Sequence, residues 1–333
     1  MATRVGINGF GRIGRMFARI ALERADLQVM AVNDITDAHT LAHLLDFDST
    51  RGRLGRKVAY TSNSLIVDGN PISVLSERDP AEIDWQKYGV DVVIESTGKF
   101  RSRDTAKLHL KGGARKVLIS APGKDADLTI VLGVNDHRYD PHVHDVVSNA
   151  SCTTNCVAPM VKVLHERFGV VQGFMTTVHA FTSDQMLLDG PHKDLRRARS
   201  ATSSIVPTST GAAQAVGEVI PDMAGRLDGV ALRVPVEDGS LTDLAAVLTC
   251  EVAADQVNDA FAAAAAIPLA GVLRYCTDPI VSRDVVGDPA SCVFDSALTR
   301  ASGTLVKVFG WYDNEWGYAS RLADVAALLG ERQ

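Results

Sequence analysis

The sequence has no long apolar run and no excess of basic residues, and each absence excludes a class of protein. Its longest apolar stretch, residues 260–273, is rich in alanine, contains Pro268 and is too short to span a bilayer. Aspartate and glutamate (40) outnumber lysine and arginine (34), so the formal net charge is −6 and gives no general attraction for nucleic acid. We therefore expect neither a membrane nor a nucleic acid as partner.

Cysteine is also scarce. The five cysteines are an odd number in a chain of 333 residues, which favours reduced thiols over a framework of disulfides. The sequence enters a strand-like pattern at once, without the basic and apolar regions typical of a secretory signal. Both features lead us to expect a cytoplasmic protein, and 46% hydrophobic with 22% charged residues is typical of a globular chain.

The first half of the sequence alternates short β-branched runs with helical patterns. We expect strands at residues 4–8, 28–33, 90–95, 116–120, 129–132 and 146–148, with a helix at 12–23 after the first strand. Strands that alternate with helices are typical of an α/β fold, a doubly wound parallel sheet of the Rossmann type. Residues 58–75, which contain an Asp-Gly-Asn-Pro turn, predict a smaller antiparallel excursion.

After residue 150 the pattern changes. We expect strands at residues 169–182, 230–236, 241–252, 273–275 and 305–311, joined by fewer helices. This order predicts an α+β domain with a mainly antiparallel sheet and helices on one face. The predicted domains are therefore 1–150 and 151–314, and a terminal amphipathic helix within 315–333 is expected to pack back on the first domain.

Three glycines, Gly9, Gly11 and Gly14, follow the first expected strand and open the helix after it. Without side chains they permit a tight turn, so that the helix N-terminus can donate N–H groups to a pyrophosphate. Asp34 stands about 20 residues beyond Gly14, where a carboxylate can accept hydrogen bonds from both ribose hydroxyls of an adenosine. The alternative is a glycine turn in another kind of α/β protein, but this context favours a dinucleotide site.

Asp34 also favours NAD over NADP as the dinucleotide. A 2′-phosphate would lie against an unpaired carboxylate, and like charges in contact are destabilising. Arg12 and Ile13, at the start of the helix, are predicted to offer phosphate-facing N–H groups, with a core contact as the alternative for Ile13.

Residues 148–159, Ser-Asn-Ala-Ser-Cys-Thr-Thr-Asn-Cys-Val-Ala-Pro, place two cysteines four residues apart. No second Cys or His pair lies close by in the sequence, so we expect no metal, and a disulfide within one helical turn is sterically poor. If residues 151–155 begin a helix, its N-terminus lowers the pKa of the Cys152 thiol. The alternative is a buried structural cysteine. Pro159 implies a helix that is bent or begins late, with Cys156 facing the interior.

A thiol nucleophile needs a base, and His179 ends an expected strand in Thr-Thr-Val-His-Ala-Phe-Thr. The other histidines, His109 among them, lie in loop-like or polar helical contexts with no comparable partner. Three features suit an anion: the basic run at residues 193–199, the hydroxyl-rich loop at 207–213, and Arg233 in an apolar strand. The alternative for the basic run is a solvated face or an interchain salt-bridge patch, and the alternative for the hydroxyl-rich loop is an ordinary helix cap. For Arg233 the alternative is a structural carboxylate partner.

Six segments of the sequence carry a family resemblance. They are residues 6–14, 148–159, 176–182, 193–199, 210–213 and 311–318, and the last reads Trp-Tyr-Asp-Asn-Glu-Trp-Gly-Tyr. Together and in this order they resemble phosphorylating glyceraldehyde-3-phosphate dehydrogenase of the bacterial type, over nearly the full length of the chain.

The resemblance implies a covalent mechanism. Cys152 attacks the aldehyde of glyceraldehyde 3-phosphate, His179 takes the thiol proton and stabilises the oxyanion, NAD receives a hydride, and inorganic phosphate releases 1,3-bisphosphoglycerate from a thioester. The implied substrate-phosphate residues are Thr182 and Arg233. Those implied for the attacking phosphate are Ser151, Thr153, Thr210, Gly211 and Arg196, with Arg197 and Arg199 as alternatives to Arg196. Those implied for the cofactor are Asn314 at the nicotinamide amide and Arg78 and Ser120 at the adenine. The resemblance also implies a homotetramer, in which the loop that carries the basic run reaches toward the cofactor of a neighbouring subunit.

The sequence departs from the family pattern near the site. Phe181 and Ser183 replace the usual tyrosine and asparagine, and Gln214 replaces a usual lysine. Our hypothesis is an isozyme whose altered pocket wall changes how electrophilic inhibitors reach Cys152.

Two other functions compete with this one. Erythrose-4-phosphate dehydrogenase shares the glycine and cysteine segments, but that family tends to lose the patterns at residues 176–182 and 210–213. A binding protein that keeps the NAD fold without catalysis is the other alternative, and the intact Cys152 and His179 oppose it.

Overall fold

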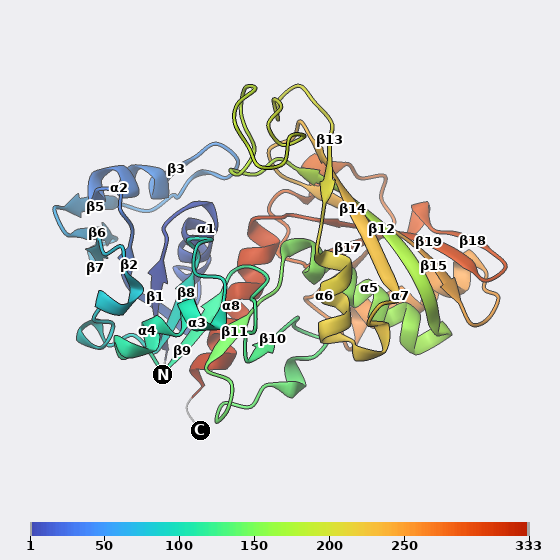
Figure 1. Cartoon of the computed structure of the whole chain (residues 1–333), viewed down its shortest axis with the longest axis horizontal. Helices are drawn as coiled ribbons and strands as arrows, with labels where there is room; N and C mark the ends of the chain where they lie inside the picture. Colours follow the sequence, from blue (N-terminus) through green and yellow to red (C-terminus); the bar gives the residue numbers. More distant parts are fainter. Residues whose placement is uncertain (1, 332–333) are drawn as a thin grey trace. The chain divides into compact units, whose positions relative to one another are not determined.

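The computed structural model describes residues 2–331, which divide into two compact units (Figure 1). Within the described residues, the first unit contains 2–130, 137–150 and 319–331, and the second contains 131–136 and 151–318. Helix α8 (Trp316–Gly330) begins in the second unit and belongs to the first from Ala319 onward.

The first unit is built on a nine-stranded sheet. Its strands, in spatial order, are β10 (Leu128–Thr129), β11 (Val146–Ser148), β9 (Lys116–Ile119), β8 (Val92–Glu95), β1 (Thr3–Asn8), β2 (Leu27–Asn33), β7 (Asn70–Leu75), β6 (Ser64–Val67) and β5 (Val58–Thr61). The pairs from β10 to β7 are parallel, whereas β5, β6 and β7 pair antiparallel. The predicted doubly wound sheet and its antiparallel excursion are therefore confirmed.

Helices and short strands complete this unit. They are α1 (Arg12–Ala21), α2 (Ala38–Asp46), α3 (Arg103–Ala106), α4 (Leu108–Lys111) and the ribbon of β3 (Phe47–Asp48) and β4 (Gly52–Arg53). The strand predicted at 129–132 is wrong beyond Thr129. The side chain of Asn135 accepts a hydrogen bond from the Val131 N–H at 2.9 Å, and this turn ends the pairing.

The second unit is built on an eight-stranded sheet. Its main path is β13 (Val206–Ser209), β14 (Leu227–Val234), β12 (Val170–Ala180), β15 (Ser240–Leu248), β19 (Leu305–Tyr312), β17 (Cys292–Asp295) and β16 (Leu273–Cys276), and β18 (Arg300–Ser302) pairs with β19. The sheet is mainly antiparallel, as predicted, but β12 pairs parallel with β14 and β16 with β17.

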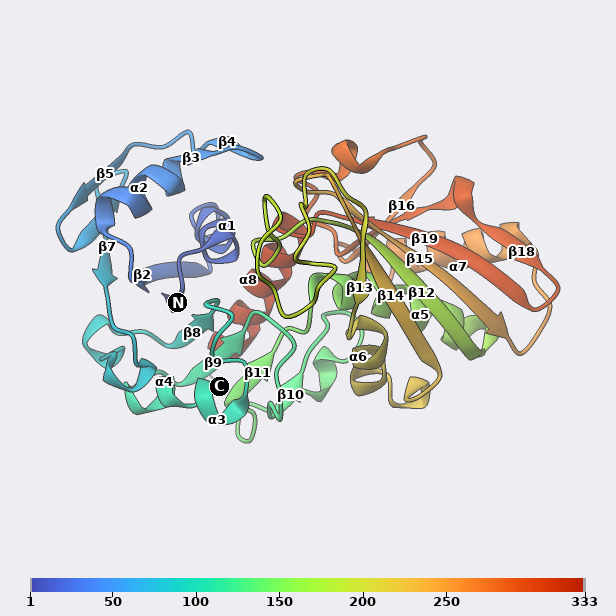
Figure 2. The ribbon, with the colours of Figure 1, turned by 45° about the horizontal axis from the view of Figure 1, so that its top comes forward.

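Helices cover one face of this sheet: α5 (Cys152–Phe168), α6 (Ala212–Val219) and α7 (Ala254–Ala266) (Figure 2). Strand β15 alternates buried and half-buried side chains over its whole length, as expected of a sheet packed on one side only. Short 3₁₀ turns lie at Pro80–Glu82, Gln86–Tyr88, Asp136–Arg138, Pro221–Met223, Ser282–Val285 and Ser296–Leu298.

Helix α5 begins at the cysteine motif. The Ser151 hydroxyl accepts a hydrogen bond from the Thr154 N–H at 3.0 Å, so that Ser151 caps the helix and Cys152 is its first residue. The helix therefore begins within residues 151–155, where the sequence indicated a helix start, and of the two effects expected of Pro159 the late start does not occur. Cys156 is fully buried, as predicted.

Candidate active site

The glycine turn of the first unit requires glycine for steric reasons. Gly9 has φ +91°, and a Cβ there would lie 2.7 Å from the Thr97 nitrogen, while a Cβ on Gly14 would lie 2.3 Å from the Gly9 oxygen. Gly11 precedes α1, and a Cβ on it would meet nothing within 4 Å. The N-terminus of α1 is therefore open on this side, and its N–H groups can bind an anion.

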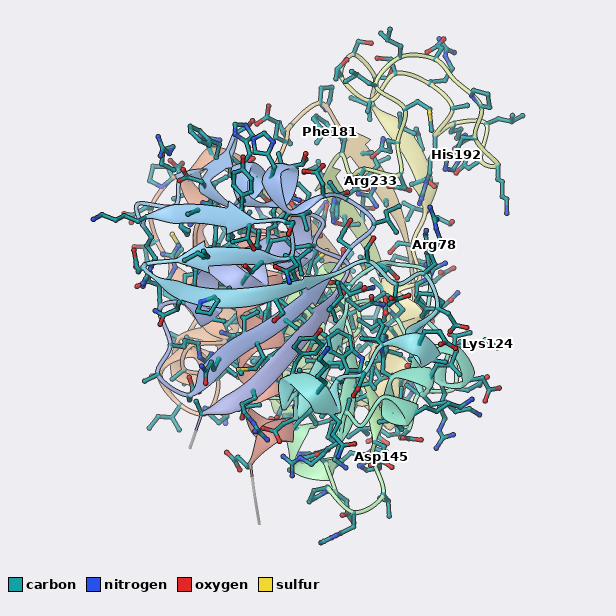
Figure 3. All side chains as sticks on the ribbon, turned by 90° about the vertical axis from the view of Figure 1, so that its left-hand side faces the viewer. Arg78, Lys124, Asp145, Phe181, His192 and Arg233 are labelled. Atoms are coloured by element: carbon teal, nitrogen blue, oxygen red, sulfur yellow. The ribbon has the colours of Figure 1, made fainter. Side chains whose placement is uncertain are left out.

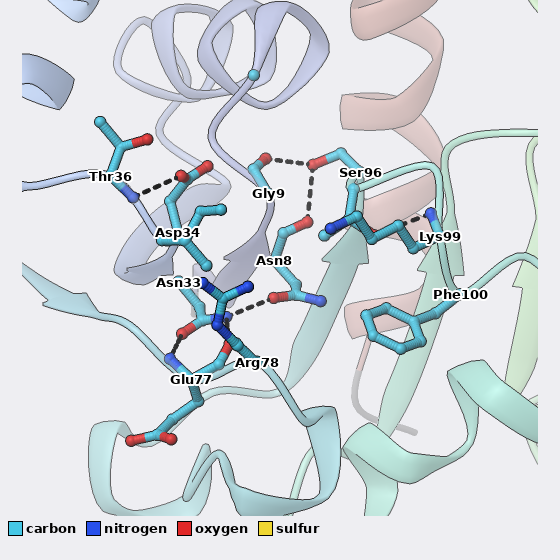
Figure 4. A pocket seen from close by; sticks show the side chains of 13 residues that line it. Asn8, Gly9, Asn33, Asp34, Thr36, Glu77, Arg78, Ser96, Lys99 and Phe100 are labelled. Atoms are coloured by element: carbon cyan, nitrogen blue, oxygen red, sulfur yellow. Dashed lines mark hydrogen bonds between the residues drawn. The ribbon is translucent and has the colours of Figure 1, made fainter.

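A pocket of about 370 Å³ lies next to this turn (Figure 4). Asp34 lines it from the end of β2, and its carboxylate accepts hydrogen bonds from the Phe10 N–H at 2.8 Å and the Thr36 N–H at 3.0 Å. These two bonds orient the carboxylate and leave acceptor capacity for a ligand. The residues lining the pocket are Asn8, Gly9, Gly11, Asn33, Asp34, Ile35, Thr36, Glu77, Arg78, Ser96, Thr97, Lys99 and Phe100.

The other predicted cofactor residues are placed differently. Arg78 lines the pocket, whereas Arg12, Ile13 and Ser120 are not in its lining. The Arg12 guanidinium forms an ion pair with the buried side chain of Asp48 at 2.5 Å. Ser120 follows β9, where its N–H donates to the Glu95 carbonyl oxygen.

Two residues that line the pocket, Asn8 and Asn33, belong to a buried hydrogen-bond network that also contains Glu95, His109 and Trp85. The Asn33 amide donates to Asn8 at 2.7 Å, and the Asn8 amide donates to Glu95 at 2.6 Å. His109 Nδ1 accepts from the Trp85 indole at 3.0 Å, so its Nε2 carries the proton and donates to Glu95 at 3.0 Å.

The expectation that His109 has no comparable partner is therefore wrong. His109 is fully buried, and both of its ring nitrogens are bonded. Sequence reasoning missed this network because its residues are brought together by packing between β8, α4 and the 3₁₀ segment near Trp85. No short sequence motif predicts this hydrogen-bond network.

Cys152 and His179 lie together in the second unit. Cys152 Sγ is 3.4 Å from His179 Nε2, at the start of α5 and near the end of β12. His179 Nδ1 lies 2.7 Å from the Ala180 carbonyl oxygen, which can only accept. The imidazole proton is therefore assigned to Nδ1, and Nε2 presents its lone pair to the thiol.

Burial dominates the acid–base properties of this pair. It raises the pKa of the Cys152 thiol to about 11, although the charge of Arg233 and hydrogen bonds from Thr153 oppose the change. It lowers the pKa of His179 to about 3, and Arg233 adds to that decrease. This direction is opposite to the predicted lowering of the thiol pKa, because desolvation of the sulfur exceeds the opposing effects of Arg233 and Thr153.

Arg233 lies beside His179, to which β14 pairs it in parallel register. Its Nη1 is 2.9 Å from His179 Nδ1 and donates to the Ala180 oxygen at 3.0 Å and to the Thr182 hydroxyl at 3.3 Å. Its Nε is buried without a partner, and no carboxylate of residues 2–331 forms an ion pair with it. The charge of Asp184 acts on Arg233, but the ion pair of Asp184 is with Arg197, so an anion can still be bound at Arg233.

The basic run lies on the long connection between β12 and β13, where Figure 3 labels Phe181 at its beginning and His192 within it. Arg197 donates to the Thr208 hydroxyl at 3.0 Å and forms an ion pair with Asp184 at 2.5 Å. Arg196 is exposed. Arg197 is therefore the arginine of the run that packs against β13.

Three further residues predicted to bind phosphate, Thr153, Thr210 and Gly211, lie at or just before the N-termini of α5 and α6. The Thr153 hydroxyl is buried against the Tyr312 hydroxyl at 2.9 Å, and the Thr210 hydroxyl accepts from the Ala212 N–H at 3.2 Å. Gly211 precedes α6 with open space around its α-carbon.

Asn314 is buried, and its Oδ1 accepts from the Ser240 hydroxyl at 2.6 Å. Ser240 also accepts from the Ala180 N–H at 3.1 Å, and sequence reasoning did not single it out.

Residues 2–331 contain no group of three His, Cys, Asp or Glu side chains that could hold a metal ion. Over the same range, every helix is too short or too polar to cross a bilayer.

The fold and the pairs above define a class of protein: a dinucleotide-binding α/β unit joined to a unit with a thiol and a base in contact. Family models agree with both parts. The glyceraldehyde 3-phosphate dehydrogenase NAD binding domain matches residues 3–103, and the C-terminal domain of the same family matches residues 151–314. The chain belongs to the glyceraldehyde-3-phosphate dehydrogenase family, and is an oxidoreductase with NAD as its cofactor.

Relatives match over the full length. The chain is 57% identical to glyceraldehyde-3-phosphate dehydrogenase 2 of Streptomyces avermitilis and 58% identical to glyceraldehyde-3-phosphate dehydrogenase of Streptomyces coelicolor, with 100% of each chain covered. It is 55% identical to the Geobacillus stearothermophilus enzyme of that name, over 100% of this chain and 99% of the relative.

Proposed function

We propose that this chain converts D-glyceraldehyde 3-phosphate and inorganic phosphate to 1,3-bisphosphoglycerate. The observation that carries the proposal is the 3.4 Å contact between Cys152 Sγ and His179 Nε2, beside Arg233, whose buried Nε has no partner. The names of the relatives at 55–58% identity support the same substrate. NAD, when bound, supplies the acceptor for the hydride that the aldehyde loses.

The side chains of the pair divide the covalent chemistry. As the Cys152 sulfur bonds to the aldehyde carbon, the thiol proton passes to His179 Nε2, which is unprotonated near neutral pH, and the carbonyl oxygen gains the negative charge. After oxidation the acyl group is a thioester. Attack by phosphate then breaks the S–C bond, releases the acyl phosphate and regenerates the sulfur.

Two sets of donors are assigned to the two phosphates. Thr182 and Arg233 hold the phosphate of the substrate, since Arg233 already donates toward the threonine hydroxyl. The attacking phosphate is assigned to Ser151, Thr153, Thr210, Gly211 and an arginine of the basic run. We choose Arg197 over Arg196, because Arg197 is anchored on Thr208 next to that loop.

The first unit is proposed to bind the adenosine half of NAD. Its pocket fits that group, because Asp34 can accept from the ribose hydroxyls and the open N-terminus of α1 suits the pyrophosphate. Arg12 and Ile13 are proposed to contribute backbone N–H groups, since the Arg12 side chain pairs with Asp48. Arg78 and Ser120 are assigned to the adenine side and Asn314 to the nicotinamide amide.

A homotetramer is proposed from an uncovered sheet face. Phe174 (72% exposed), Val230 (50%) and Ile205 (66%) are large apolar side chains on or beside the strands β12, β14 and β13. Such a cluster is typical of a surface covered by another subunit. We expect Phe174→Glu to shift the sedimenting species to a smaller mass, and an unchanged mass would contradict this assignment. A cytoplasmic location is proposed because the five cysteines are free.

Rapid mixing of the enzyme with NAD and glyceraldehyde 3-phosphate, without phosphate, tests the proposed reaction. We expect a burst of NADH equal to the concentration of sites, followed by turnover only when phosphate or arsenate is added. Cys152→Ser abolishes the burst, and Cys250→Ser, which removes an exposed thiol, retains it. Turnover that is indifferent to both anions would overturn the proposal, and a faster burst with erythrose 4-phosphate would favour the sister activity.

The isozyme hypothesis stays a hypothesis. Phe181 is half-buried, whereas Ser183 and Gln214 are exposed. It fails if the enzyme and its Phe181→Tyr, Ser183→Asn double variant are inactivated at equal rates by a cysteine-directed epoxide.

A further inference from the structure

Two buried carboxyl groups meet in the second unit. Asp238, in the turn between β14 and β15, is 5% exposed, and Asp313, directly after β19, is 1% exposed. The pairing of Ser240 with Tyr312 between β15 and β19 brings these two buried carboxyl groups next to each other, and the charge of Asp313 acts on Asp238. Two neighbouring carboxylates offer each other only acceptors and like charges, which favours a proton held by one of the two groups.

The surrounding donors decide which carboxyl holds it. Asp313 accepts from three backbone N–H groups, those of Gly287 at 2.7 Å, Glu315 at 2.9 Å and Trp316 at 2.6 Å. Asp238 accepts from one, the Gly239 N–H at 2.8 Å, and its buried Oδ2 has no hydrogen-bond partner among the described residues. Because N–H donors stabilise the charged form, Asp313 is the carboxylate and Asp238 is the acid.

Within residues 2–331, the charged side chains that act on Asp238 are acidic. Burial comes first in raising the pKa of Asp238 to about 8, followed by the charges of Asp313 and Glu315. The charge of Asp238 in turn acts on the Cys152 thiol, at the start of α5. From the 3₁₀ turn at Ser282–Val285, the Ser282 carbonyl oxygen packs on Gly239, while the charged side chains of that turn, Arg283 and Asp284, are exposed.

The carboxyl pair adjoins the candidate active site through the backbone. Asp313 precedes Asn314, and Ser240, two residues after Asp238, donates to Asn314 and accepts from the Ala180 N–H next to His179. A negative charge on Asp238 would also raise the pKa of the Cys152 thiol. The protonation state of one buried acid is therefore linked to both the position and the ionisation of reacting groups.

We propose that Asp238 is a positioning residue that must keep its proton, and that losing it weakens Cys152 as a nucleophile. In the acid form, Asp238 donates to Asp313 and joins the β14–β15 turn to the segment that carries Asn314. In the ionised form, two buried carboxylates repel each other and the added charge disfavours the thiolate. The proposal rests on the assignment of Cys152 as nucleophile.

Alkylation of Cys152 by iodoacetamide tests this without substrate or cofactor. The rate is measured from pH 6 to 9.5 for the full-length protein and for Asp238→Asn, with Cys152→Ser as the blank for the other thiols. We expect equal rates at pH 6, and above about pH 8 a wild-type rate that falls behind the variant by about three- to tenfold at pH 9.5. A ratio of the two rates that is constant over this range would overturn the proposal.

Asp228→Asn is the matched control. Asp228 lies on β14 and accepts from the N–H of the next residue, Gly229, at 2.8 Å, as Asp238 does from Gly239, but Asp228 is exposed. We expect its profile to equal the wild type, and the same change in both variants would contradict the proposal.

If Asp238→Asn fails to fold, the pH dependence of the wild-type alkylation rate tests the proposal by itself. A logarithm of the rate that rises with a single slope, without a bend near pH 8, would contradict the proposal. A missing NADH burst with a normal alkylation difference would instead reject the proposed reaction alone.

Discussion

The two buried histidines of this protein, His109 and His179, differ in what surrounds them. Both are at most 4% exposed. His109 has a donor, Trp85, on one nitrogen and an acceptor, Glu95, beside the other, so both of its hydrogen bonds are made. His179 has Arg233 near one nitrogen and a thiol facing the other.

This difference distinguishes a histidine with a structural role from a histidine that can take part in catalysis. A histidine whose two bonds are satisfied holds neighbouring elements in place and gains nothing from a change of protonation. A histidine that presents an unprotonated ring nitrogen to a thiol can accept the thiol proton, which is the role of a general base. Burial alone therefore does not identify the reactive histidine of this chain.

The largest expected effect is on catalysis at His179. His179→Asn should lower kcat by about 10²- to 10⁴-fold, because the thiol proton then lacks an acceptor, with the free energy of unfolding changed by about 1 kcal/mol or less. Steady-state rates and urea unfolding measure the two quantities. His142→Asn, at an exposed position, serves as control. Equal losses of kcat in both variants would contradict a specific catalytic role for His179.

The reverse pattern is expected at His109. His109→Leu leaves the Trp85 indole and the Glu95 carboxylate without their partner, and should lower the free energy of unfolding by about 3 kcal/mol. Urea unfolding measures this, and kcat at saturating NAD should stay within about twofold of the wild type. A large loss of kcat without a loss of stability would instead indicate a catalytic role for His109.

The same contrast can be drawn between neighbouring arginines. Arg197→Lys should raise the KM for phosphate by about tenfold, because lysine cannot keep the planar contacts to Thr208 and Asp184. Arg196→Lys, on an exposed side chain, should change it by less than about twofold. Initial rates at varied phosphate check this, and the opposite order would return the assignment to Arg196.

The smallest expected effect concerns stability against pH at Asp238. Its folded pKa, about 8, is raised above the unfolded value of about 3.9, so its contribution is complete below pH 4 and is lost as the pH rises toward 8. Wild-type Tm should therefore fall by a few degrees relative to Asp238→Asn between pH 5 and 8. Parallel Tm curves for the two proteins would show that Asp238 titrates as it does when unfolded.

Sequence reasoning succeeded where a local pattern has one structural solution. The glycine turn after β1, the acidic residue at the end of β2 and the helix start at residues 151–155 each depend on residues that are close together in the sequence. It failed at the strand beyond Thr129, where one asparagine side chain redirects the backbone, and at His109, whose partners come from other elements.

The sequence by itself determined the family, the two kinds of sheet and the position of a cysteine at the start of a helix, because these depend on residue type and short spacing. Only the tertiary structure decided that desolvation sets the pKa of Cys152, that Arg197 is the anchored arginine, and that Asp238 meets Asp313. The physical reason is that solvent exclusion and charge proximity arise from the whole packed unit, and residues distant in the chain supply both.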